Sequence, residues 1–255
     1  MGLIQLVVQI IRAFLNLRKA MSGVDRARVM MQDPVMAAYI RGDYRTAKSL
    51  AGDPFLRADM ARNLGQFEEA EQGLRTFAQS EKNPKLAALI QSSLGEVLLE
   101  QKRYQEAMDC FQASLRLWPE RGATYRDVAE VWLRRGDNPQ EALRWARLAV
   151  EKEKAGPGVT EDTKMLNLGE DLATLAWAVA VHTHDATEVD RLSEEVALPG
   201  ITPACAKAQV DYHFGKAWVE LGDSRKSSLY FELAARTDPN GIWGRAAAAE
   251  AVPKA

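Results

Sequence analysis

The sequence has few of the residues that build disulfide-linked, metal-bound or strand-rich proteins. It holds two cysteines in 255 residues, Cys110 and Cys205, which lie far apart with no CxxC or Cys/His spacing near either. This excludes a disulfide framework and a zinc site, and it fits a reducing, cytoplasmic compartment. Aromatic residues make up only 7% of the chain, and β-branched residues almost nowhere alternate with polar ones. Because Ala, Leu, Glu, Arg and Gln dominate instead, the sequence predicts an all-α fold.

The chain also lacks an excess of charge of one sign and the common catalytic motifs. The 33 Lys and Arg residues nearly balance 35 Asp and Glu residues, for a net charge of −2. A dedicated nucleic-acid-binding domain would carry a strong basic excess, so no nucleic-acid partner is expected. There is no Walker loop, no GxGxxG after a strand and no nucleophile elbow. The sequence therefore predicts a protein that is not an enzyme and holds no cofactor.

Histidine is scarce as well, and the three residues His182, His184 and His213 are the only ones that suggest a metal. Side chains two positions apart on a helix lie about 200° apart, so His182 and His184 could share an ion only across a turn. A metal-dependent enzyme, the alternative from another class, would need all three histidines to meet a carboxylate at one point. We expect a solvated turn at the pair instead, and no metal.

The charge is unevenly distributed along the chain. Through residue 50 there are eight basic and three acidic residues, a net of +5, so the remaining residues carry −7. No acidic residue precedes Asp25. A basic end of this kind favours an acidic partner or an anionic membrane surface.

That basic end begins with an apolar amphipathic helix, expected over residues 1–24. In residues 3–17 the polar positions are spaced 4, 3 and 4 apart and share one narrow stripe of a helix. The segment would span roughly 22 Å, less than the roughly 30 Å of a bilayer core. Three roles remain open: binding in a membrane interface, capping the end of the fold, or self-association with another chain. The contact residues in the first and last of these roles would be Leu3, Ile10, Arg12, Phe14, Arg18 and Lys19.

A short phrase recurs through the rest of the chain. It consists of a glycine or lysine, two or three polar or aromatic residues, and a small residue shortly afterwards. The copies are Gly42 to Ala47, Gly65 to Ala70, Lys102 to Ala107, Gly136 to Ala142 and Gly222 to Ser227. Glycine ends a helix where positive φ is needed, and the small residue lets the next helix approach closely. Each copy therefore predicts a tight turn between two packed helices.

Residues 88–121 form the most complete unit. Its pattern is Leu94-Gly95, Leu98, Ala107, Phe111 and Pro119 within 34 residues. This pattern closely resembles the tetratricopeptide repeat, although Gln91 stands at the family's tryptophan position. Gly95 and Ala107 would remove bulk where two helices cross, Phe111 would fill the gap toward the neighbouring repeat, and Pro119 would end the second helix.

Further copies extend the resemblance over residues 33–250. Residues 208–241 repeat the spacing with Gly215, Trp218, Phe231 and Pro239, and residues 122–156 carry Trp132 and Ala142. Residues 33–87, with brief helices, and 160–202, with an elongated first helix, are expected to be degenerate repeats. A final segment, 242–252, is expected to be a capping helix.

The resemblance implies a right-handed α-solenoid of stacked antiparallel helix pairs. Members of this family are scaffolds or adaptors that bind a peptide or helical segment of a partner protein in a concave groove. The family's ligand-facing positions correspond here to Ser92, Glu96, Leu99, Arg126, Glu130, Tyr212 and Lys216. If Arg126 lies on the solvated groove surface, Arg126→Glu should weaken partner binding and leave melting unchanged. The alternative within binding proteins is a membrane-peripheral assembly factor tethered by the N-terminal helix.

Overall fold

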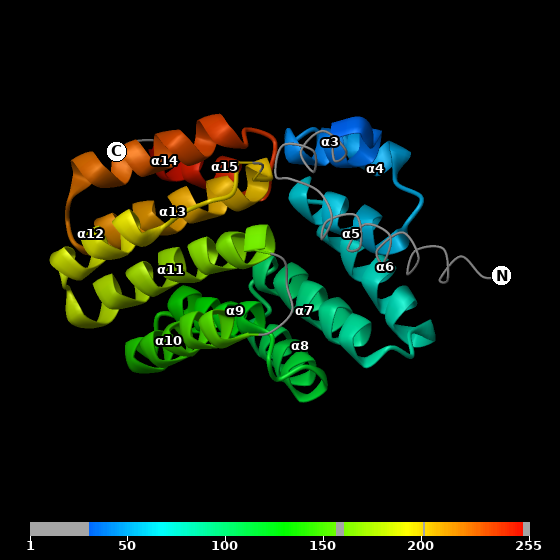
Figure 1. Ribbon diagram of the computed structural model, residues 1–255, viewed down its shortest axis with the longest axis horizontal. Helices are drawn as coiled ribbons and strands as arrows, with labels where there is room; N and C mark the ends of the chain where they lie inside the picture. Colours follow the sequence, from blue (N-terminus) through cyan, green and yellow to red (C-terminus); the bar gives the residue numbers. More distant parts are fainter. Residues whose placement is uncertain (1–30, 157–160, 201, 252–255) are drawn as a thin grey trace.

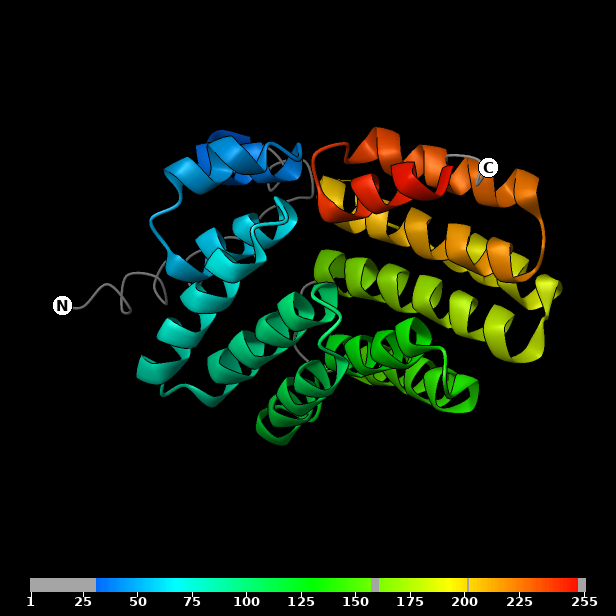
Figure 2. The ribbon, with the colours of Figure 1, turned by 180° about the vertical axis from the view of Figure 1, so that it is seen from behind.

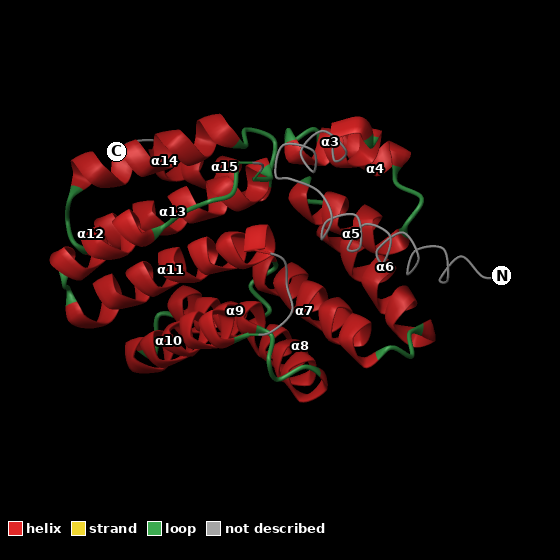
Figure 3. Cartoon of the chain, viewed as in Figure 1, coloured by secondary structure: helices red, strands yellow, loops and turns green. Residues whose placement is uncertain are grey.

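The computed structural model describes residues 31–156, 161–200 and 202–251. Within these ranges the chain forms thirteen α-helices and no strand (Figure 3), which confirms the predicted all-α solenoid. In chain order the helices are α3 Pro34–Ile40, α4 Tyr44–Leu50, α5 Pro54–Asn63, α6 Phe67–Ser80, α7 Pro84–Glu100, α8 Tyr104–Leu117, α9 Gly122–Arg135, α10 Pro139–Ala155, α11 Glu161–Thr183, α12 Ala186–Glu195, α13 Ala204–Glu220, α14 Ser224–Thr237 and α15 Ile242–Ala251. The N-terminal helix expected over residues 1–24 lies outside the described ranges.

Four of the described helices begin at an Asp or Asn followed by proline. At the start of α7, the Asn83 side chain accepts hydrogen bonds from the backbone N–H groups of Lys85 and Leu86 at 3.0 and 3.2 Å. Pro84 follows at the first helical position, where no N–H is required. The same arrangement starts α3 at Asp33, α5 at Asp53 and α10 at Asn138. Local sequence therefore fixes where these helices begin.

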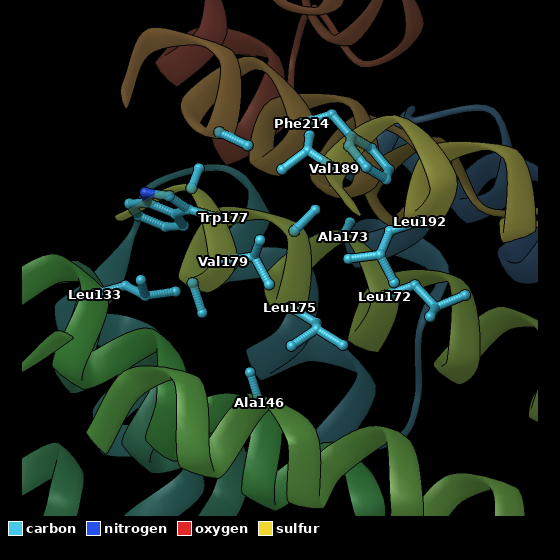
Figure 4. Packing of buried hydrophobic residues seen from close by; sticks show 14 of the residues in the cluster. Leu133, Ala146, Leu172, Ala173, Leu175, Trp177, Val179, Val189, Leu192 and Phe214 are labelled. Atoms are coloured by element: carbon cyan, nitrogen blue, oxygen red, sulfur yellow. The ribbon is translucent and has the colours of Figure 1, made fainter. Parts of the chain in front are cut away.

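Consecutive helices pack as antiparallel pairs that stack side by side along a curved path (Figure 1). Three clusters of buried apolar side chains run through the stack, the largest joining α9 to α13. In Figure 4 Leu172, Val189, Leu192 and Phe214 converge from α11, α12 and α13. Each helix thus buries apolar residues against the pairs before and after it, as in other repeat proteins.

The crossing of α7 and α8 depends on the absence of a side chain at Gly95. A Cβ atom there would lie 2.5 Å from Cε1 of Phe111. Gly215 and Phe231 repeat this contact between α13 and α14, where a Cβ atom would lie 2.6 Å from the ring. Phe111 therefore packs over a glycine of its own helix pair, in addition to joining the apolar cluster shared by α5 to α9.

The two ends of the solenoid meet, a contact that the sequence did not predict. Helices α3 to α5 share a buried cluster with α13 to α15, and Figures 1 and 2 show α3 beside the last helices. Across this seam the Tyr44 hydroxyl donates to Oδ1 of Asp238 at 2.9 Å, and the Tyr39 hydroxyl lies 3.3 Å from Sγ of Cys205. The stack therefore closes on itself, and its inner surface surrounds a central space.

Candidate functional site

The inner surface encloses a hollow of about 300 Å³, which we call the central hollow. Its lining comes from the first helix of each pair (α3, α5, α7, α9, α11 and α13), from the residues that precede α9 and α13, and from α15. Charged side chains dominate its polar lining. They are Asp59, Arg62, Glu96, Glu100, Arg121, Arg126, Asp127, Glu130 and Glu170. Three aromatic rings, those of Tyr39, Phe55 and Trp243, line it as well.

Four of the seven residues predicted to face a ligand line the central hollow: Glu96, Leu99, Arg126 and Glu130. The other three lie outside its lining. Ser92 is buried and donates to Oδ2 of Asp127 at 2.7 Å. The structure thus gathers four of the five predicted positions of α7 and α9 at the hollow.

The two predicted positions on α13 have contacts of another kind. The ring of Tyr212 lies against those of Phe231 and Trp243, with centroids 5.7 and 5.4 Å apart. Lys216 pairs with Glu250 of α15 at 3.1 Å. Both side chains therefore join α13 to its neighbouring helices.

Arg126 is buried rather than solvated, with 7% of its surface exposed. Its guanidinium contacts Glu170 at 2.5 Å and Asp171 at 3.4 Å across the α9–α11 interface. Removing one partner of a buried ion pair is strongly destabilising, because it leaves the other charge uncompensated. The expectation that Arg126→Glu leaves melting unchanged is therefore wrong, since the substitution places a fourth carboxylate beside Asp127, Glu170 and Asp171.

Carboxylates crowded around Arg126 have raised pKa values. Burial, with a further contribution from Glu96, raises the pKa of Asp127 to about 6. Burial also raises the pKa of Asp171 to about 8, and the neighbouring acids Glu153 and Glu170 add to the effect. Arg126 opposes both shifts but does not cancel them. One guanidinium is thus too little to compensate this group of acids.

A second charged group joins α7 and α9 beside the hollow. Arg134 contacts Glu130 at 2.6 Å and Glu100 at 2.8 Å, and its guanidinium lies 5.3 Å from the ring centroid of Trp243. Burial raises the pKa of Glu130, but Arg134 and His213 outweigh it, so that the pKa is well below its usual range. Glu130 is therefore ionised near neutral pH.

Sequence reasoning missed several of the residues that form these groups. The ion pair of Arg134 with Glu130 could have been predicted, because the two residues are four positions apart on one helix. No sequence pattern indicated a role for Arg62. It pairs with Asp59 at 3.0 Å and with Glu96 at 2.9 Å. It reaches the hollow from α5, in a segment where the repeat pattern is degenerate.

The three histidines do not converge. His213 is fully buried in α13, where Nδ1 lies 3.0 Å from the Thr174 hydroxyl of α11. His182 lies eight residues beyond Thr174 on the same helix, roughly 12 Å along its axis. Among the residues that the structure describes, no group of three or more His, Cys, Asp and Glu side chains is placed to hold a metal ion. The histidines therefore do not form the shared site that the metal-dependent alternative requires.

The remaining predicted contacts, those of Leu3, Ile10, Arg12, Phe14, Arg18 and Lys19, lie outside the described residues. Over 31–156, 161–200 and 202–251, no helix has the length and apolar character needed to cross a bilayer.

Comparison with known proteins adds a family match. No curated protein matches the chain. Among the solved structures that resemble it is BtubC (BKLC) from P. vanneervenii, at 16% identity and a TM-score of 0.49, with 96% of this chain and 94% of that one covered. Another is YrrB, described as a TPR protein with an unusual peptide-binding site, at 17% identity and a TM-score of 0.37, with 82% of this chain and 97% of that one covered. The family model for the tetratricopeptide repeat matches residues 86–152, which span helices α7 to α10. Over these residues the sequence is similar to the tetratricopeptide repeat family.

Proposed function

We propose that this protein is a non-catalytic interaction scaffold that binds a peptide segment of a partner in the central hollow. The observation that carries the proposal is the shared lining: the first helices of successive pairs present Glu96, Leu99, Arg126 and Glu130 to one enclosed space. Stacked helix pairs commonly bind extended ligands on this inner surface. At about 300 Å³ the hollow is at the lower end of the range for small-ligand pockets, so a peptide side chain fits it better than a whole helix.

A library of displayed random peptides, selected on the full chain, tests this proposal. Ser93 lines the hollow, and Ser93→Trp would fill part of it. We expect this variant to lose binding of the selected peptides. Ser228→Trp is the matched control, because Ser228 is exposed on α14. Peptides that bind Ser93→Trp as well as the native chain would contradict the proposal.

A second candidate function rests on the charge distribution near the N-terminus. A membrane-peripheral assembly factor would bind anionic vesicles through residues 3–19, with Arg12, Arg18 and Lys19 beside lipid headgroups. Flotation should then require acidic lipid, weaken with salt and fall sharply in Ile10→Asp, because a charge enters the apolar layer. If the segment caps the fold instead, Ile10→Asp should lower the melting temperature, and vesicles should have no effect. Self-association predicts a third result, a change in oligomeric state with neither of these effects.

A further inference from the structure

The central hollow contains more carboxylates than guanidinium groups. Six carboxylates and three arginines line it. The arginines already have partners: Arg62 pairs with two acids, Arg126 with three, and Arg121 donates to Ser92 and Thr124 at 3.0 and 2.7 Å. An anionic ligand would therefore meet repulsion in the hollow, whereas a cationic ligand would reduce it.

Two buried polar atoms beside the hollow have no partner within the described part of the chain. They are Nε of Arg62 and Nε of Arg126, both on lining residues, and Arg126 has only 7% of its surface exposed. A buried polar group without a hydrogen-bond partner lowers stability, so these atoms of the lining have hydrogen-bonding capacity that is not satisfied. The backbone carbonyl groups of a peptide could accept from these two nitrogens, while a basic side chain of the same peptide would meet the surplus of carboxylates.

Arg134 shows how the same lining residues hold a guanidinium. It lies between the carboxylates of Glu100 and Glu130 and over the ring of Trp243, all three of which line the hollow. Carboxylate pairs combined with an aromatic face favour guanidinium and ammonium groups. The rings of Tyr39 and Phe55 offer further aromatic surface on the α3 and α5 side.

We propose that the central hollow selects a peptide segment through a basic side chain, an arginine or lysine, held by the lining carboxylates and aromatic rings. This inference rests on the proposed function and specifies the chemistry of its ligand. Peptides selected on the full chain should be enriched in Arg and Lys and depleted in Asp and Glu. Enriched peptides that are neutral or acidic, yet are lost in Ser93→Trp, would overturn this inference and leave the proposed function standing. Peptides that bind Ser93→Trp as well as they bind the native chain would overturn both this inference and the proposed function.

A direct test replaces the basic residue of a selected peptide. Citrulline keeps the shape of arginine and removes its charge, so the dissociation constant measured by fluorescence anisotropy should rise about tenfold to a hundredfold. Glutamate at the same position should abolish binding. Unchanged affinity for the citrulline peptide would overturn the inference, and this result does not depend on the folding of any variant.

Matched variants of the protein complete the experiment. Glu96→Gln combined with Glu100→Gln removes two charges from the hollow, and binding of the arginine peptide should weaken by at least about tenfold. Glu68→Gln combined with Glu232→Gln removes the same charge from exposed positions on α6 and α14 and should leave affinity unchanged. Equal weakening by both pairs would indicate attraction by overall charge and would overturn a specific site.

Discussion

At the residue scale, the lack of a side chain at Gly95 allows two helices to pack closely. Its backbone lies under the Phe111 ring, where a Cβ atom would be 2.5 Å from Cε1. The small residue is therefore required by packing, against the usual preference of helices for alanine over glycine.

We expect Gly95→Ala to lower the free energy of unfolding by about 1–3 kcal/mol, because the methyl group overpacks the Phe111 contact. Gly73 of α6 is the matched control. A Cβ atom there would lie 3.7 Å from that of Ala58, an ordinary contact, so Gly73→Ala should raise the free energy of unfolding by about 0.5–1 kcal/mol. Denaturant melts measure both values. A stabilised Gly95→Ala would contradict the described packing.

Asp171 should make stability depend on pH. Its pKa of about 8 in the folded chain is above its ordinary value of 3.8, mainly because it is buried. Between these values the folded chain holds a proton that the unfolded chain has released, so stability falls as the pH rises through this window. Asp171→Asn cannot ionise. The melting temperature of Asp171→Asn minus that of the native chain should therefore be greater at about pH 9 than at about pH 5. A difference independent of pH would show that Asp171 does not titrate in this window.

At the scale of the element, the turns between paired helices follow one geometry. Gly42, Gly65, Gly136 and Gly222 have φ between 71° and 77°. Lys102 occupies the corresponding position between α7 and α8 with φ of 60°. Its N–H bonds to the carbonyl of Leu99 at 2.9 Å, as that of Gly222 bonds to Val219 at 3.0 Å. The recurring phrase therefore requires a left-handed residue even where the sequence supplies lysine.

Substitutions at this turn position should change stability through the backbone conformation alone. Lys102→Gly should raise the free energy of unfolding by about 0.5–1 kcal/mol, because relief of left-handed strain exceeds the entropic cost of glycine. Gly222→Ala should lower it by a similar amount, since no atom lies within 4 Å of the added Cβ to contribute a clash. Thermal melts of the two variants provide the test. Two changes of the same sign would refute the shared geometry.

At the scale of the whole molecule, closure of the stack brings the first and last described helices together around the central hollow. Tyr44 is 1% exposed and bonds to Asp238 across 194 residues of sequence. Arg245 of α15 adds a bond from Nη2 to the carbonyl of Asn63 at 3.2 Å. The seam therefore joins the first and last described helices, and Tyr39, Cys205 and Trp243 lie around the same hollow.

Tyr44→Phe should lower the free energy of unfolding by about 1–3 kcal/mol, because it leaves the buried Asp238 carboxyl without this donor. Tyr125→Phe is the control. The Tyr125 hydroxyl donates to the carbonyl of Pro119 at an exposed site, where water can replace it, so the change should be small. Chemical denaturation distinguishes the two variants. Equal effects would indicate that the seam contributes little to stability.

The helices and their turns could be predicted from the sequence by itself, because their signals are local. Small residues at Gly95 and Ala107, the phenylalanine at 111 and the glycine turns act within a single helix pair of about 34 residues. Such short-range contacts recur with each repeat, so one pattern predicts many of them. The positions that correspond to the family's ligand-facing ones also follow from the register of the repeat. Among them are Glu96, Leu99, Arg126 and Glu130.

Only the tertiary structure decided which of those positions are buried and what they contact. Arg126 meets Asp171 from a helix 45 residues away, and Tyr44 meets Asp238 across the closed seam. The first contact depends on the packing of two neighbouring helix pairs. The second depends on the rotation accumulated over the whole stack, to which every interface contributes a small angle and for which no single residue carries a signal. The enclosed, acid-rich hollow follows from that rotation, since it brings charges from distant segments of the chain to one place.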